Sequence, residues 1–140
     1  MTREAIVNFF ARREEAWKRH DAGALAGDHA ENGVWESPMA GTVSGRTEIE
    51  RVYRAWFTGF PDLKPRWDEL LIDEGHAAQF GLVSGTDTGG FMGLPPTGKA
   101  FQVPALFYYQ LRDGKIVRLR IVYDFTGLLV QVGVLKVKRV

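Results

Sequence analysis

Residues 89–99 read GGFMGLPPTGK, and the chain continues with DGKI at 113–116 and YDF at 123–125. Glycines around a stiff Pro-Pro pair are typical of a connection between strands, because glycine tolerates positive φ angles and proline fixes its own φ. Asp113-Gly114 is a two-residue hairpin signal between two apolar runs. This part of the chain therefore predicts strands joined by tight connections, with an antiparallel last pair.

The extended segments around these connections are residues 66–73, 77–86, 101–112 and 115–123. Apolar residues occupy both alternating faces of the third segment, so we expect both faces of that strand to be covered. Residues 125–132, followed by Gly133, are predicted to form a short terminal helix.

Upstream of these strands the apolar residues recur with helical spacing. One broad aromatic face is formed by Ile49, Val52, Tyr53, Trp56 and Phe57. We predict a helix here with Ser44 as its cap. A similar stripe predicts a first helix over residues 3–19. Asp21 is placed to cap a short second helix over 22–29, before a strand around 34–36.

Helices first and antiparallel strands afterwards indicate an α+β domain rather than a doubly wound parallel sheet. With 140 residues, the chain is most naturally one domain over 1–140. We expect a cone in which helices pack on the concave face of a curved antiparallel sheet and enclose an apolar interior.

Composition excludes several function classes. The chain has 18 basic and 17 acidic residues, well mixed, so no nucleic-acid footprint is expected. The absence of cysteine excludes disulfides and thiolate chemistry. His20, His29 and His76 share no metal-ligand spacing, and no phosphate-binding or dinucleotide fingerprint occurs, so we expect no metal or other cofactor. No signal peptide and no membrane-length apolar run are apparent, which favours the cytoplasm and no membrane association.

The order and spacing of these motifs resemble those of the SnoaL-like polyketide cyclases, a branch of the nuclear transport factor 2 and ketosteroid isomerase superfamily. The resemblance runs from Gly45 through FPD at 60–62 and PPTGK at 95–99 to LVQVG at 129–133. It implies the cone fold and a general acid/base aspartate, at the position of Asp124, in an intramolecular aldol ring closure. The cyclases place histidines two residues before that aspartate and on the adjoining strand.

Here Val122 and Gln110 stand at those two positions, so the hydrogen-bonding shell differs. Asp124 itself has two readings. At the end of an apolar strand it would be partly desolvated, which raises the pKa of a carboxyl group toward the range of a general acid/base. Immediately before a helix, it would instead serve as the N-cap.

A second group of residues is a candidate lining for a ligand pocket, with plain core packing as the alternative. The aromatic and sulfur side chains of this group are Trp35, Tyr53, Trp56, Phe57, Phe91, Met92 and Tyr108. Gln110 would orient a carbonyl. Arg120 would hold an enolate or carboxylate, unless it is solvated at the outer end of its strand. Asp87 is either a second acid or a turn residue.

These observations favour a cofactor-free enzyme of the SnoaL-like type that moves a proton at a carbon of a small hydrophobic carbonyl compound, polycyclic or aromatic in shape. Two alternatives stay open: a non-catalytic ligand-binding or dimerisation module of the same fold, and a related isomerase or hydrolase. We also expect a homodimer that packs the outer faces of the strands around 77–86 and 101–123 together.

Overall fold

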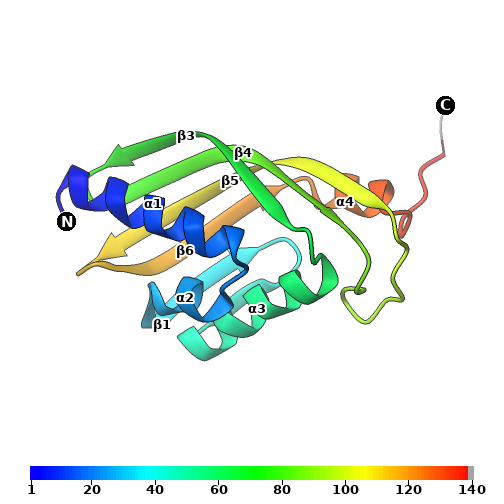
Figure 1. The fold of residues 1–140 in the computed structure, drawn as a ribbon, viewed down its shortest axis with the longest axis horizontal. Coiled ribbons are helices and arrows are strands. Elements are labelled where there is room, and N and C mark those ends of the chain that lie inside the picture. The colour runs from blue at the N-terminus through cyan, green and yellow to red at the C-terminus, as the bar shows by residue number, and fades with distance from the viewer. Residues whose placement is uncertain (139–140) are drawn as a thin grey trace.

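In the computed structural model, which describes residues 1–138, one six-stranded sheet curves around the first three helices (Figure 1). The strand order is β2-β1-β6-β5-β4-β3. The elements are α1 (Arg3–Lys18), α2 (Ala22–Gly27), β1 (His29–Ser37), β2 (Gly41–Ser44), α3 (Arg46–Gly59), β3 (Lys64–Asp73), β4 (His76–Thr86), β5 (Ala100–Arg112), β6 (Lys115–Tyr123) and α4 (Phe125–Gln131). The predicted α+β class is confirmed.

The sheet departs from the prediction in one pairing. Every neighbouring pair is antiparallel except β1 and β6, which run parallel. Parallel neighbours require a long crossover, and here the chain passes through β2, α3 and three further strands before β6 returns beside β1. The predicted hairpin between β5 and β6 is present, with Asp113 at φ 52° and Gly114 at φ 75°.

The first strand is longer and more irregular than the sequence indicated, and the second, β2, was not predicted. β1 begins at His29, which was predicted to be helical, and its register with β6 shifts between His29 and Val34. A Cβ at Gly33 would lie 3.2 Å from the Ile116 carbonyl oxygen, so the backbones approach closely at this irregularity. β2 is short and mostly exposed, and such a strand carries no apolar alternation.

The helices follow the predicted periodicity. α1 buries the apolar stripe Ile6, Phe9, Phe10, Ala16 and Trp17. Asp21 caps α2 as predicted, because its carboxylate accepts a hydrogen bond from the Ala24 N–H at 3.0 Å. The N-cap of α3 is Gly45 at φ 93° instead of Ser44, and no side chain caps this helix.

The loop between β4 and β5 is tied down by Asp87. This fully buried carboxylate accepts hydrogen bonds from the Gly90 N–H, the Thr97 N–H and the Thr97 hydroxyl, each at 3.1 Å. The loop also packs on the end of α3, where a Cβ at Gly89 would lie 1.9 Å from the Thr58 carbonyl oxygen. Asp87 thus makes the turn contacts that were one of its two predicted roles.

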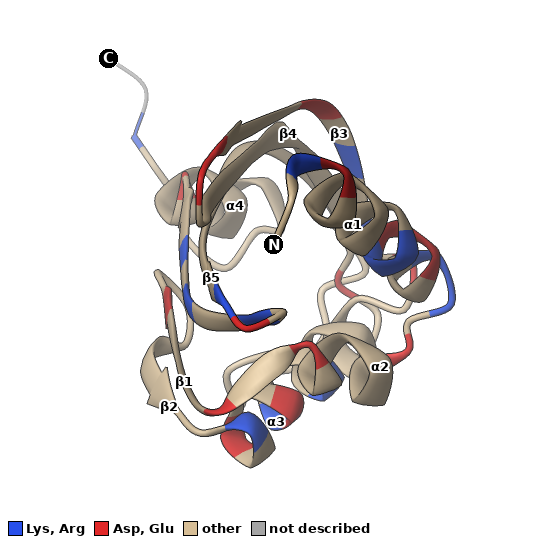
Figure 2. Ribbon diagram, turned by 90° about the vertical axis from the view of Figure 1, so that its left-hand side faces the viewer, with Lys and Arg blue, Asp and Glu red and all other residues tan. Residues whose placement is uncertain are grey.

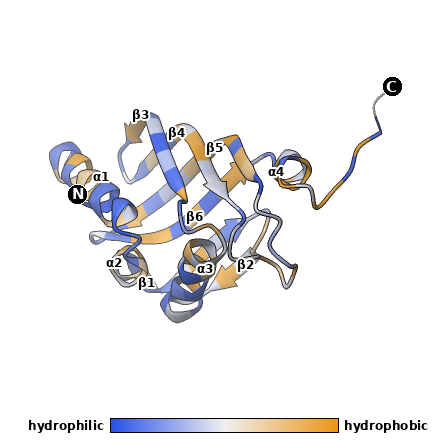
Figure 3. Ribbon diagram, turned by 45° about the vertical axis from the view of Figure 1, so that its right-hand side comes forward, coloured by the Kyte–Doolittle hydropathy of each residue, from blue (hydrophilic) through white to orange (hydrophobic). Residues whose placement is uncertain are grey.

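The two faces of the sheet differ in character. Along β5, the side chains of Phe101, Val103, Ala105, Phe107 and Tyr109 are buried toward the helices, whereas the alternate residues face outward. Figure 3 shows hydrophobic and hydrophilic residues interspersed along the strands of the sheet. Basic and acidic residues are interspersed over the helices and strands, as Figure 2 shows, in agreement with the small net charge.

Candidate functional site

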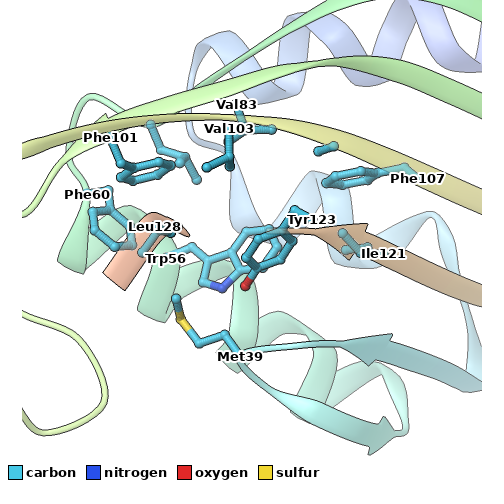
Figure 4. A pocket seen from close by; sticks show the side chains of 12 residues that line it. Met39, Trp56, Phe60, Val83, Phe101, Val103, Phe107, Ile121, Tyr123 and Leu128 are labelled. Carbon is cyan, nitrogen blue, oxygen red and sulfur yellow. The ribbon is translucent and has the colours of Figure 1, made fainter. Parts of the chain in front are cut away.

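An apolar cavity lies inside the cone between the sheet, α3 and α4 (Figure 4). Its lining comes from seven parts of the chain and consists of Met39, Trp56, Phe60, Leu63, Val83, Phe101, Val103, Ala105, Phe107, Ile121, Tyr123 and Leu128. The cavity has a volume of about 30 Å³, which is far below the several hundred Å³ of a small-molecule site. A bicyclic ligand therefore requires these side chains to move.

The lining follows from the two-residue alternation of the strands and the helical spacing of α3. The alternate residues of β5 and β6 that face the helices supply one wall, and the aromatic face of α3 supplies Trp56 opposite them. Phe60 and Leu63, in the segment between α3 and β3, close the side.

Tyr123 lines this cavity with the apolar part of its ring, and it carries a hydroxyl group. Figure 4 shows it on the same side of the cavity as Met39 and the Trp56 indole nitrogen. Burial raises the pKa of Tyr123 to about 12. The phenol therefore keeps its proton at neutral pH, and it can donate a hydrogen bond to a ligand oxygen once its side chain turns the hydroxyl into the cavity.

Asp124 is exposed and caps α4. Its carboxylate accepts a hydrogen bond from the Gly127 N–H at 2.8 Å. Asp124 is two residues after Val122, so continued alternation from β6 places the two side chains on the same, outer face. Val122 is 63% exposed on that face. In the chain, however, Asp124 directly follows Tyr123 and precedes Leu128, and both of these residues line the cavity. The capping contact is present, and the acid/base role stays a prediction.

Of the predicted pocket residues, the structure brings one to the cavity and places four close behind it. Trp56 lines the cavity itself. Trp35 packs against Trp56 at 5.2 Å between ring centroids, and Tyr53 packs against Trp35 at 5.1 Å. Phe91 packs on the lining residue Phe60. Phe57 packs against Trp17 and His20 at the outer end of α3.

The other four predicted residues lie away from the cavity. Met92 is 59% exposed in the loop between β4 and β5. Tyr108, Gln110 and Arg120 are on the outer face of the sheet, because they alternate with buried residues of β5 and β6. Arg120 Nε lies 3.0 Å from the Glu36 carboxylate, which also pairs with Arg118. None of these contacts tests ligand binding, which stays a prediction for all nine residues.

A buried polar network at the other end of the cone was missed. Arg13, only 2% exposed, donates hydrogen bonds to Asp28 at 3.0 Å, to the Tyr53 hydroxyl at 2.9 Å and to the Leu25 carbonyl at 3.1 Å. Arg12 adds a second ion pair to Asp28 at 2.9 Å from the solvent side. One feature of the sequence indicated that Arg13 is buried. It lies within the apolar stripe of α1, four residues after Phe9.

The network continues from Tyr53 to His29. The Nε2 atom of His29 lies 2.8 Å from the Tyr53 hydroxyl. The hydroxyl oxygen accepts from Arg13, and the tautomer of His29 sets whether the Tyr53 hydroxyl or the His29 Nε2–H donates in this second contact. Nδ1 is buried and has no hydrogen-bond partner among the described residues. Burial, together with the charges of Arg13 and Arg46, holds the pKa of His29 well below its ordinary value of 6.5.

This neutral histidine predicts a loss of stability in mild acid. The unfolded chain binds a proton at His29 below pH 6.5, whereas the folded protein does not, so stability falls as the pH drops through 6.5. We expect about 1.4 kcal/mol of unfolding free energy from this residue to be lost between pH 7.5 and 5.5. Urea titrations of wild type and His29→Gln measure it, because glutamine can accept from Tyr53 without titrating. Equal pH dependence in the two proteins contradicts the prediction.

Two further properties concern ligands and membranes. Among residues 1–138, no group of three or more His, Asp or Glu side chains is arranged to hold a metal ion. Within the same residues, no helix is long and apolar enough to cross a membrane.

Solved structures share this fold over nearly the whole chain. TsrD from Streptomyces laurentii is 21% identical with a TM-score of 0.83, over 96% of this chain and 99% of that one. AclR from Streptomyces galilaeus, described as a candidate hydroxylase, is 26% identical with a TM-score of 0.78, over 92% and 85%. IdmH from Streptomyces antibioticus, described as a candidate polyketide cyclase, is 25% identical with a TM-score of 0.74, over 91% and 97%. No curated protein sequence matches the chain.

A strongly curved sheet closed by helices around an apolar cavity, with such structural neighbours, defines the nuclear transport factor 2-like fold. Within that fold class the sequence is more specific. The chain belongs to the SnoaL-like polyketide cyclase family, whose family profile matches residues 9–132. The resemblance seen in the sequence motifs is thereby confirmed.

Proposed function

We propose that this protein is a cofactor-free enzyme that moves a proton at a carbon atom of a hydrophobic carbonyl compound, in the manner of an aldol cyclisation. The observation that carries the proposal is the apolar cavity with Tyr123, a residue that keeps its phenolic proton, among its lining residues. An apolar enclosure strengthens a hydrogen bond to a carbonyl oxygen, and that hydrogen bond stabilises the negative charge that develops when a neighbouring carbon loses a proton. Membership of the cyclase family supports the same chemistry.

The proposal assigns the proton transfer to Asp124. This carboxylate follows the cavity residue Tyr123 and begins the helix that supplies Leu128. To reach a substrate carbon it must release the Gly127 N–H and turn toward the cavity. The exposed surroundings of Asp124 permit such a movement, since the capping hydrogen bond is the contact that holds it.

A second candidate function is a non-catalytic module that binds a small hydrophobic ligand. The capping contact of Asp124 favours it, because a carboxylate used for helix capping needs no other role. The cavity and Tyr123 serve a binding protein equally well.

Hydrogen exchange at a carbon acid separates the two functions. The probe is 2-tetralone, a flat bicyclic ketone, and deuterium uptake at its C1 position in D₂O is followed by proton NMR. We expect the protein to accelerate this uptake and Tyr123→Phe to slow it, because the phenylalanine cannot donate to the carbonyl oxygen. Binding of 2-tetralone with no acceleration favours the non-catalytic module.

We further propose that the protein is a homodimer that buries the outer face of its sheet. Phe80, Leu106 and Val122 are opposite one another on β4, β5 and β6 and form an apolar row across that face. Phe80 is 41% exposed and Val122 is 63% exposed. A monomer rarely leaves such a row in water.

The dimer is tested by analytical ultracentrifugation at micromolar concentration. We expect wild type to sediment as a dimer and Val122→Asp as a monomer, because a charge in the row opposes sheet-to-sheet packing. Val7→Asp is the matched control, since Val7 is 44% exposed on α1 and lies off the sheet. A monomeric wild type, or a dimer in both variants, removes the assigned interface.

A further inference from the structure

A second hollow lies outside the cone wall, next to the apolar cavity. This outer groove, between the C-terminal end of α1 and residues 61–67, has a volume of about 530 Å³. Trp17, Trp67 and His20 are among its lining residues. Six charged residues also line it, namely Glu14, Lys18, Arg19, Asp62, Lys64 and Arg66. Its volume is in the range of small-molecule sites. The inner cavity alone, at about 30 Å³, is far below that range.

The wall between the two hollows is thin. Leu63 lines both of them. The two indoles of the outer groove also contact the inner lining directly. Trp67 packs edge-on against Phe107 at 5.0 Å between ring centroids, and Trp17 does so at 6.3 Å. A single layer of side chains thus separates a groove of ligand size from an apolar cavity.

Leu63 is placed to move. It lies between α3 and β3, outside both elements, so its displacement breaks no helix or sheet ladder. The position of its backbone is set locally by two hydrogen bonds. Its carbonyl oxygen accepts from His20 Nε2 at 2.7 Å, and its N–H donates to the Phe60 carbonyl at 2.9 Å. The His20 ring is itself stacked on Phe57 at 4.1 Å.

We infer that the outer groove and the apolar cavity are two parts of one binding site for a flat, bicyclic aromatic ketone, and that they join when Leu63 moves aside. The rings lie against the indoles of Trp17 and Trp67, and the carbonyl end enters the cavity toward the Tyr123 hydroxyl. The inference rests on the proposed function for the carbonyl end of the ligand. Binding in the groove itself is independent of catalysis.

The four tryptophans of the chain report on this arrangement. Trp17 and Trp67 line the groove, Trp56 lines the cavity, and Trp35 lines neither. The experiment titrates 2-tetralone into ¹⁵N-labelled full-length protein and follows the four indole N–H resonances. We expect Trp17, Trp67 and Trp56 to shift together with one common Kd, and Trp35 to shift least.

Three outcomes overturn the inference. A shift of Trp56 without Trp17 and Trp67 means that the ligand reaches the cavity by another side. Shifts of Trp17 and Trp67 without Trp56 mean that the groove binds separately. No shift of any tryptophan at millimolar 2-tetralone removes the assigned ligand class. Deuterium uptake is measured on the same samples, so a joint site without exchange refutes only the proposed catalysis.

Leu63→Ala tests the wall directly. Removing the side chain removes the need to displace it, and we expect the common Kd to fall by about tenfold. Leu25→Ala is the control, because Leu25 is a fully buried leucine of α2 that lines neither the cavity nor the groove, and its Kd should stay within about twofold of wild type. An unchanged Kd in Leu63→Ala contradicts the role of Leu63. If Leu63→Ala does not fold, the tryptophan titration of wild type decides the inference alone.

Discussion

Arg13→Ala is expected to lower the free energy of unfolding by about 3–5 kcal/mol, the usual loss when one partner of a buried ion pair is removed. Arg13 is 2% exposed and holds Asp28, Tyr53 and the Leu25 carbonyl at once. Its removal takes a buried donor away from all three acceptors and leaves Asp28 with only the exposed Arg12. Because domains of this kind are stable by about 5–15 kcal/mol in total, we expect a large shift of the urea midpoint at unchanged slope.

Arg12→Ala is the matched control for this prediction. Arg12 contacts the same Asp28 carboxylate at 2.9 Å, but its side chain is 58% exposed. Solvent screens such a pair, so the expected loss is about 0–1 kcal/mol. Equal losses in the two variants would show that burial does not decide the strength of these contacts. The double variant Arg13→Met, Asp28→Asn should recover part of the loss, because it removes both buried charges together.

Asp124→Asn is expected to leave ligand affinity unchanged and to slow deuterium uptake into 2-tetralone by about 10²–10⁴-fold, the usual contribution of a positioned acid/base. Asparagine is also a good N-cap, so α4 should still form on the Gly127 contact. The variant therefore removes the proton acceptor while keeping the architecture. The rate of deuterium uptake and the Kd of 2-tetralone, obtained from the shifts of the tryptophan indole resonances, are measured on the same samples.

Asp21→Asn is the corresponding control, since Asp21 caps α2 through the Ala24 N–H in the same way. It should change neither rate nor affinity. If Asp124→Asn also keeps the wild-type rate on a ketone that the protein turns over, Asp124 is only a helix cap. The Tyr123 hydroxyl, carried by a residue that lines the cavity, then remains the polar group for which the structure supports a role in binding.

Much of the local structure could be predicted from the order of residues. The α1 stripe, the Asp21 cap and the Asp113-Gly114 hairpin all appear where the sequence indicated. Each depends on residues no more than a few positions apart, and such neighbours determine helix caps, turns and the period of an amphipathic element. The family motifs carried the fold class in the same way.

The candidate site was less accessible from sequence, because burial depends on which distant segments pack together. Phe107 and Tyr108 are adjacent aromatics, yet the first lines the cavity and the second lies on the outer face beside His76. Tyr123 and Asp124 divide similarly between the cavity wall and an exposed cap. In a strand the side chains alternate faces, and only the pairing of the whole sheet settles which face is inside.

The buried polar network shows the same division between sequence and tertiary structure. An arginine within an apolar helical stripe is visible in the sequence at position 13, but its partners Asp28 and Tyr53 lie 15 and 40 residues further along. Sequence alone determined the elements other than β2, the order in which they occur and the family, because these follow from local spacing and motif order. The tertiary structure alone decided the parallel β1–β6 pair, the size of the cavity and the residues that face it, because these require contacts between segments far apart in the chain.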